Sequence, residues 1–157
     1  MNAPGISLTE IMATMAVLGL VAALSVPFAL TSWQAATLKA GAEELVTTLN
    51  GARQLALDQN QTVCVTNNGS TLAYRVSSCG APPWTGLGTE GDGGIRLASS
   101  VRVAAATANV TFNYLGASGT GGTFTVLNPA SGRALCVVVA PSGRITIAGP
   151  TIQPVCP

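Results

Sequence analysis

The most reactive side chains of this sequence are four cysteines, Cys64, Cys79, Cys136 and Cys156. None lies in the short CxxC spacing of zinc or thioredoxin-like sites, and no histidine is present to complete a mixed metal site, so we expect no metal. An even number of cysteines favours two disulfides if the body lies outside the cytoplasmic membrane. Pairing Cys64 with Cys79 and Cys136 with Cys156 would close modest loops. Four cysteines nevertheless allow three connectivities, and buried reduced thiols are the alternative.

Acid-base chemistry finds little support in the remaining side chains. Catalysis usually needs clustered titratable groups, whereas this chain has no histidine and six scattered acidic residues. Glu90 and Asp92 lie near each other, but in a glycine-rich stretch where a solvated turn is the more common explanation. The sequence contains no nucleophile elbow and no phosphate loop. We therefore expect neither an enzyme nor a cofactor.

The length of the chain and its net charge limit how many domains it can form and which charged partners it can attract. The 157 residues allow one domain of ordinary size with an N-terminal appendage. Only 8% of the residues are charged and the formal net charge is +1, so no strong phosphate-attracting field exists. Bulk electrostatics therefore identifies no partner.

The N-terminal region contains an uncharged run of 20 residues, from Ile11 through Leu30. As a helix, such a run is roughly 30 Å long, which matches the hydrocarbon core of a bilayer. A cleaved secretory signal is one alternative, but MNAPGISLTE before the run contains no lysine or arginine. A buried soluble helix is another, although a small domain can hardly cover such a helix on every side. Pro27 should kink or locally loosen the helix, or is a proline that a membrane helix tolerates.

Glu10 stands at the margin of this apolar run. A carboxylate there is costly unless it is paired or reaches the interface, which makes it a candidate functional residue. The alternative is a side chain that simply extends to the lipid headgroups. Glu10 thus needs either a partner or water.

The stretch Gly5-Ile6-Ser7-Leu8-Thr9-Glu10 followed by the apolar run resembles the class III signal peptide of type IV pilins and type II secretion pseudopilins. The resemblance implies that prepilin peptidase cleaves after Gly5 and that the new N-terminus, Ile6, is N-methylated. Glu10 would become the fifth mature residue and would meet the amino group of Ile6 on a neighbouring subunit. Two departures are a leader without basic residues and Ile6 in place of the commoner Phe or Met.

Downstream of the apolar run, residues 31–61 predict an amphipathic continuation of the helix that ends between Asp58 and Gln61. Its apolar stripe should pack on a globular body; a surface helix of an ordinary domain would show the same stripe. This stripe has the three- or four-residue spacing of one helix face: Leu38, Ala42, Leu45, Leu49, Ala52 and Ala56.

Residues 62–157 predict a β-rich body. Asn67-Asn68-Gly69-Ser70 is a hairpin signal, because asparagine and glycine tolerate positive φ. The residues from 78 to 94 contain too many glycines and prolines for regular structure and should form an exposed loop. Within it, Trp84 is a packing anchor or a contact residue. The expected strands are 62–65, 72–76, 95–97, 101–103, 110–115, 123–127, 134–139 and 144–147.

Three stretches of the body resemble the GspH/FimT group of minor pilins and pseudopilins: residues 49–56 running into 63–65, Val110 to Tyr114 leading to Gly116, and Ser142 to Ile145. The resemblance implies an α+β pilin-like fold, with a long N-terminal helix packed on a mostly antiparallel sheet. It implies four segments: leader 1–5, membrane or filament-core helix 6–30, amphipathic helix 31–61 and periplasmic domain 62–157. Its partners would be other pilins or pseudopilins, prepilin peptidase and the inner membrane. The protein would be a single-pass inner-membrane protein before assembly and part of a periplasmic or cell-surface filament afterwards.

A DNA-binding role in natural transformation is the alternative function. Some members of the FimT group are thought to bind DNA through a C-terminal Gly-Arg-x-Arg motif, and the corresponding Gly143-Arg144-Ile145-Thr146 keeps one of the two arginines. Arg133 and Arg144 could lie close together and contact phosphates. So few cations on a near-neutral domain should bind DNA weakly at physiological salt.

Overall fold

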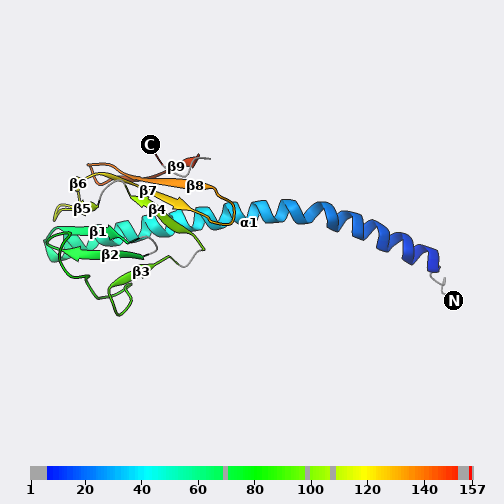
Figure 1. Cartoon of the computed structure of the whole chain (residues 1–157), viewed down its shortest axis with the longest axis horizontal. Coiled ribbons are helices and arrows are strands. Elements are labelled where there is room, and N and C mark those ends of the chain that lie inside the picture. Colours follow the sequence, from blue (N-terminus) through cyan, green and yellow to red (C-terminus); the bar gives the residue numbers. More distant parts are fainter. Residues whose placement is uncertain (1–6, 69–70, 98–99, 107–108, 152–155, 157) are drawn as a thin grey trace, which may run out of the picture. The chain divides into compact units, whose positions relative to one another are not determined.

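The computed structural model describes residues 7–68, 71–97, 100–106, 109–151 and 156, without the side chains of residues 24, 26–28, 104–106, 150 and 151. The described chain has one long helix, α1 (Leu8–Gln59), and nine strands (Figure 1). The strands are β1 (Val63–Asn67), β2 (Thr71–Val76), β3 (Gly94–Arg96), β4 (Arg102–Ala106), β5 (Val110–Phe112), β6 (Ser118–Thr120), β7 (Gly122–Leu127), β8 (Ala134–Val139) and β9 (Ile145–Thr151).

The chain divides into two compact units, residues 1–35 and 36–157. Their boundary lies within α1, so the helix contributes to both. The second unit contains the hydrophobic core, which is built from one stripe of α1 and from residues of both sheets. The stripe is the predicted one, since Leu38, Ala42, Leu45, Leu49, Ala52 and Ala56 are all buried. The predicted end of the helix is also confirmed, because α1 stops at Gln59.

The β-rich body forms two antiparallel sheets rather than one. Sheet A has the strand order β3-β2-β1-β5-β6, and sheet B has the order β4-β7-β8-β9. The large side chains that fill the space between α1 and the sheets include Phe112 from sheet A and Phe124 from sheet B, both fully buried. The expected α+β fold is therefore present, with its β layer split between two sheets.

All eight expected strands are present, and one more was missed. β6 has the sequence Ser-Gly-Thr, which carries no apolar pattern, and it exists through its pairing with β5. β5 is shorter than expected because Asn113 begins a turn: its side-chain oxygen accepts hydrogen bonds from the backbone N–H groups of Leu115 and Ala117, each at 3.0 Å. The local hydrogen bonds of an asparagine thus end a strand that hydrophobicity alone would extend.

The first unit is described by α1 from Leu8 onward. The helical assignment continues through Pro27, whose side chain lies outside the described residues, so the kink stays a prediction. Across the part of the chain that is described, no helical stretch combines enough length and hydropathy to cross a membrane.

Candidate functional site

The first unit exposes an unusual amount of apolar surface. Leu8, Met12 and Met15 are each about two-thirds exposed or more, and Trp33 is 72% exposed. At 100° per residue the side chains from position 8 to position 21 point to every side of the helix. We call the following set the N-terminal apolar surface: Leu8, Ile11, Met12, Met15, Val17, Leu18, Leu20, Val21, Leu30 and Trp33. A helix that is apolar all round is one that something else surrounds.

Glu10 is the single acidic side chain of the first helical turn. The turn begins at Ser7, whose backbone oxygen accepts hydrogen bonds from the N–H of Glu10 at 3.0 Å and of Ile11 at 3.3 Å. Ser7 and Glu10 have the spacing of a capping box, but the Ser7 hydroxyl bonds the Thr9 hydroxyl at 2.8 Å instead. Among the described residues the exposed Glu10 carboxylate has no ion-pair partner. Gly5 and Ile6 lie outside the described residues, so cleavage and methylation stay predictions.

Both disulfides of the structure join the predicted pairs. Cys64 of β1 binds Cys79, and Cys136 of β8 binds Cys156. Because all four sulfurs are used, the alternative of free thiols is excluded. The described residues hold no cluster of histidine, cysteine or acidic side chains that would bind a metal.

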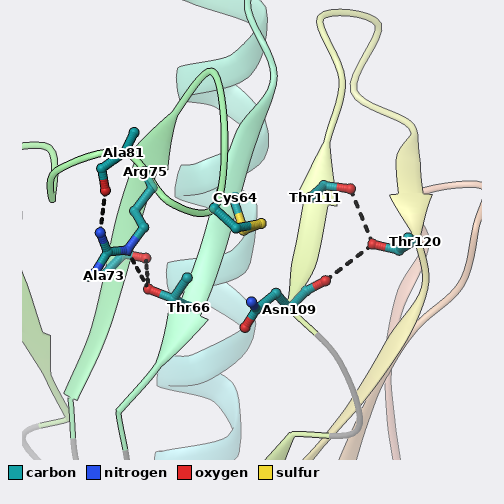
Figure 2. The surroundings of a disulfide bond; sticks show 9 residues. Cys64, Thr66, Ala73, Arg75, Ala81, Asn109, Thr111 and Thr120 are labelled. Carbon is teal, nitrogen blue, oxygen red and sulfur yellow. Dashed lines mark hydrogen bonds between the residues drawn. A yellow bond between two sulfur atoms is a disulfide. The ribbon is translucent and has the colours of Figure 1, made fainter.

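The first disulfide attaches the glycine-rich loop to sheet A (Figure 2). Arg75 of β2 reinforces the attachment, since its guanidinium donates hydrogen bonds to the Thr66 hydroxyl at 3.1 Å and to the Ala81 carbonyl oxygen (Figure 2). Trp84 follows, with its N–H bonded to the Tyr74 carbonyl at 2.7 Å and its ring 6.4 Å from the Tyr74 ring. Trp84 is therefore a packing anchor, the first of its two predicted roles.

Glu90 and Asp92 have structural roles. Asp92 accepts a hydrogen bond from the Gly94 N–H at 2.9 Å, and Glu90 pairs with Arg96 at 3.2 Å. These bonds close the loop before β3, in agreement with the solvated turn that the sequence favoured. The two carboxylates do not form an acid-base pair.

Arg133 and Arg144 do not lie close together, which corrects the sequence-based expectation. Arg133 directly precedes β8 and Arg144 directly precedes β9, and these strands are antiparallel. The two arginines therefore flank opposite ends of the six-residue β8, about 20 Å apart at 3.3 Å per residue. Both are exposed. DNA binding by a combined arginine pair loses its geometric basis.

Arg53 instead lies against Gly116, and Gly143 packs on the other side of the same turn, an arrangement that the sequence did not predict. A Cβ on Gly116 would lie 2.8 Å from the Arg53 Nε, and a Cβ on Gly143 would collide with the Gly116 carbonyl oxygen. Both glycines have positive φ, +75° and +81°, which favours glycine there. We call Arg53, Gly116 and Gly143 the glycine lock. Arg53 and Gly143 lie within two of the three stretches that carried the family resemblance, and Gly116 is the glycine to which the third stretch leads.

A comparison with known protein families identifies the family to which this chain is related. The family described as "Type II transport protein GspH" matches residues 41–143, about two thirds of the chain. This chain belongs to the GspH family. The matched range of this GspH-family protein contains α1 from residue 41 onward, both Gly116 and Gly143, and every strand except β9. GspH-family proteins are structural and non-enzymatic: minor pilins or pseudopilins of type II secretion or type IV pilus systems.

Solved structures show the same fold. Two crystal structures of the type IV minor pilin FimU from Pseudomonas aeruginosa match the GspH-family chain with a TM-score of 0.52. They are 24% and 20% identical to it, and each match covers 71% of this chain, with 88% and 93% of the FimU chain. No curated protein sequence matches significantly. The pilin relationship implies a filament at the membrane and in the periplasm, with other subunits as partners.

Proposed function

We propose that this GspH-family protein is a minor filament subunit that enters its assembly through the N-terminal apolar surface. It is held in the inner membrane by the run from Ile11 to Leu30 and is processed by prepilin peptidase after Gly5. The supporting observation is that the apolar side chains of this segment are exposed on every side of the helix. Burial of one large aliphatic side chain away from water contributes about 1.5–3 kcal/mol, so neighbouring helices would hold the part of the segment that has left the membrane. Where neighbouring helices replace lipid, van der Waals packing between the helices holds the subunit instead.

Apolar contacts alone do not determine how far one subunit helix is shifted along its neighbour. An ion pair of Glu10 with the amino group of Ile6 on that neighbour would determine this shift. Once Ile6 is the first residue, its amino group on one subunit can approach the Glu10 carboxylate of another. Two opposite charges about 4 Å apart attract by about 4 kcal/mol at an effective dielectric constant of 20, which offsets part of the cost of their desolvation. A mispaired position would leave a carboxylate alone among apolar side chains, which is strongly unfavourable. The exposed carboxylate of Glu10, with no ion-pair partner among the described residues, supports this role.

Separate measurements of membrane insertion and filament incorporation test the proposal. The variant Glu10→Gln keeps the shape of the side chain and removes its charge. It should insert in the inner membrane at the wild-type level but be incorporated at least about tenfold less into sheared filaments, because a loss of 1.4 kcal/mol already corresponds to tenfold. Glu43→Gln is the matched control, since Glu43 is an exposed carboxylate of the same helix that pairs with Lys39. Normal incorporation of Glu10→Gln would rule out the proposed role of Glu10.

Two machines can use such a subunit, a type IV pilus and a type II secretion filament. Deletion of the gene separates them, because loss of surface piliation with normal protein secretion assigns the subunit to a pilus. Loss of secretion with normal piliation assigns it to a secretion filament.

A further inference from the structure

The turn between α1 and β1 contains the acceptor pattern of N-linked glycosylation, Asn-x-Ser/Thr, as Asn60-Gln61-Thr62. The same pattern recurs at Asn68-Gly69-Ser70 and at Asn109-Val110-Thr111. A transferase has to reach both the asparagine amide and the hydroxyl two residues later, so the fold determines which match is usable. Residues 69 and 70 lie outside the described residues, which leaves the first and the third match to compare.

The match that begins at Asn109 is engaged within sheet A. Its threonine, Thr111, belongs to β5, which pairs with β1 and β6. The Thr120 hydroxyl donates a hydrogen bond to the Asn109 carbonyl oxygen at 3.1 Å and lies 3.2 Å from the Thr111 hydroxyl (Figure 2). The hydroxyl that a transferase would bind is therefore already used inside the sheet.

The match that begins at Asn60 is open by comparison. The N–H of Asn60 bonds the Leu57 carbonyl at 3.3 Å and the N–H of Gln61 bonds the Ala56 carbonyl at 3.2 Å, which are the two bonds of a Schellman motif at a helix end. Asn60 takes the left-handed position of this motif, with φ +51°, and is exposed. Within the described part of the chain, neither its amide group nor the Thr62 hydroxyl has a hydrogen-bond partner.

Termination of the helix does not by itself explain the residue types at this turn. Glycine is the usual residue at the left-handed position, because a Cβ is strained there. Asp58 places a carboxylate in the last turn of α1, where the helix end is partially negative and no basic residue of that turn compensates. Asp58 is exposed and has no ion-pair partner among the residues that the structure describes. Asp58 and Asn60 thus lower helix stability, which points to another role.

We propose that Asn60 is the attachment site of an N-linked oligosaccharide, added on the periplasmic side of the inner membrane. The Asp58 carboxylate, two residues before the acceptor, gives the transferase an anionic group to bind through a charge-assisted hydrogen bond. Neither of the other two matches has an acidic residue at that spacing. The proposal rests on the export of the body that the proposed filament function requires.

The transfer joins the Asn60 Nδ2 to the anomeric carbon of a sugar. The donor is an oligosaccharide carried on a polyprenyl diphosphate, which is a lipid of the same membrane. The bond between the anomeric carbon and Nδ2 forms while the bond from that carbon to the diphosphate oxygen breaks. Polyprenyl diphosphate leaves with the bonding electrons, and the amide loses one proton to a base of the transferase. A subunit anchored in that membrane meets the donor at a raised effective concentration.

Mass spectrometry of the protein purified from the cell envelope tests the proposal. The tryptic peptide 54–75 contains both Asn60 and Asn68, so fragmentation by electron transfer, which leaves sugars attached, has to locate the added mass. We expect the oligosaccharide on Asn60. The tryptic peptide 103–133, which contains Asn109, should be unmodified.

Two results would overturn the proposal. One is an oligosaccharide on Asn68 or Asn109 in place of Asn60. The other is an unmodified Asn60 in a chain that begins at Ile6 and carries both disulfides, which would leave the proposed filament function standing. A modified Asn60 in a chain that is absent from filaments would instead contradict the filament function alone.

Variants at the acceptor separate recognition from folding. Thr62→Ser keeps the hydroxyl and should keep the oligosaccharide, whereas Thr62→Val keeps the shape of this half-buried side chain and should lose it completely. Asn60→Gly suits the positive φ and should also lose it while the helix still ends there. Asn109→Gln is the matched control and should carry the wild-type oligosaccharide. Intact mass of the disulfide-bonded protein measures all four, and a modified Thr62→Val would contradict the proposal.

The role of Asp58 has its own test. Asp58→Asn removes the charge and keeps the shape, so the ratio of modified to unmodified protein should fall at least about tenfold. Glu43→Gln, at an exposed carboxylate of the same helix that pairs with Lys39, should leave this ratio unchanged. An unchanged ratio in Asp58→Asn would contradict recognition of the carboxylate by the transferase.

Discussion

The two halves of α1 use one secondary structure for opposite purposes. In residues 36–59 the buried apolar side chains form one stripe that packs against two sheets, whereas in residues 8–33 the described large apolar side chains lie on every side of the helix and are exposed. Helix propensity does not separate the two halves, since both are helical without interruption. The difference teaches that the angular distribution of apolar side chains, rather than their number, determines whether a helix segment completes its own domain or requires other molecules.

Substitution of one leucine in each half should give the largest contrast. Leu49→Ala removes a fully buried side chain and should lower the free energy of unfolding of the body by about 2–5 kcal/mol. Leu18→Ala removes an exposed one and should change it by less than about 0.5 kcal/mol. Urea titrations of the full chain in uncharged detergent, followed by tyrosine and tryptophan signals of the body, measure both values. Equal effects would remove the distinction between the halves.

Loss of a disulfide should also affect only the body. Cys136 and Cys156 are 20 residues apart, and a closed loop of that length stabilises by about 3 kcal/mol through the entropy of the unfolded chain. Replacement of both cysteines by serine should therefore lower the stability of the body by roughly this amount. Thermal unfolding should shift down, while the helical signal of a peptide of residues 6–35 in detergent provides the unaffected reference. An unchanged melting temperature would mean that this bond does not hold the body.

Within the body, substitutions at Gly143 and Gly132 distinguish the cost of steric crowding from the cost of backbone strain. Gly143→Ala meets both a positive φ and the Gly116 carbonyl oxygen, so we expect a loss of about 2–3 kcal/mol. Gly132→Ala, at φ +65° with no atom within 4 Å, meets only the backbone term and should lose about 1 kcal/mol. Chemical denaturation gives the free energy of unfolding of both variants, and the difference between their losses is the cost of the steric contact. A larger loss for Gly132→Ala would contradict the close approach at Gly143.

Tyr74 should give the smallest effect, which depends on pH. Its hydroxyl donates a hydrogen bond of 2.6 Å to the Thr48 carbonyl of α1, and burial raises the pKa of Tyr74 to about 12 from the usual 10. Because the folded state holds the phenol proton more tightly, the stability contributed is present below pH 10 and is lost as the pH rises from 10 towards 12. Tyr74→Phe should cost about 1 kcal/mol at pH 7 and flatten this decline. A decline in stability above pH 10 that is as steep in Tyr74→Phe as in the wild type would contradict this explanation.

Features with a local cause could be predicted from the sequence. The stripe from Leu38 to Ala56, the end of the helix and eight strands follow from periodicity, and the two disulfides join the cysteines nearest in sequence. Features with a distant cause could not. β6 has no apolar pattern of its own, and the split into two sheets depends on which strands pair across the chain.

The same division applies to the candidate sites. Glu10 is conspicuous in sequence because a carboxylate beside an apolar run is costly. In the sequence Arg53 is an ordinary helical arginine. Only the fold brings it into contact with Gly116, which lies 63 residues further along the chain. Arg133 and Arg144 are near in sequence but separated by the whole length of β8. The sequence thus singles out Glu10 and the two cysteine pairs, whereas the contact of Arg53 with Gly116 and the separation of Arg133 from Arg144 depend on the fold.

Mass spectrometry of the protein purified from the cell envelope tests the central claim most directly. Assembly through the N-terminal apolar surface requires a free amino group close to Glu10, so the account predicts a chain that begins at Ile6 and carries one methyl group on its nitrogen. A chain that still carries residues 1–5, or that begins far downstream of Glu10, would contradict it.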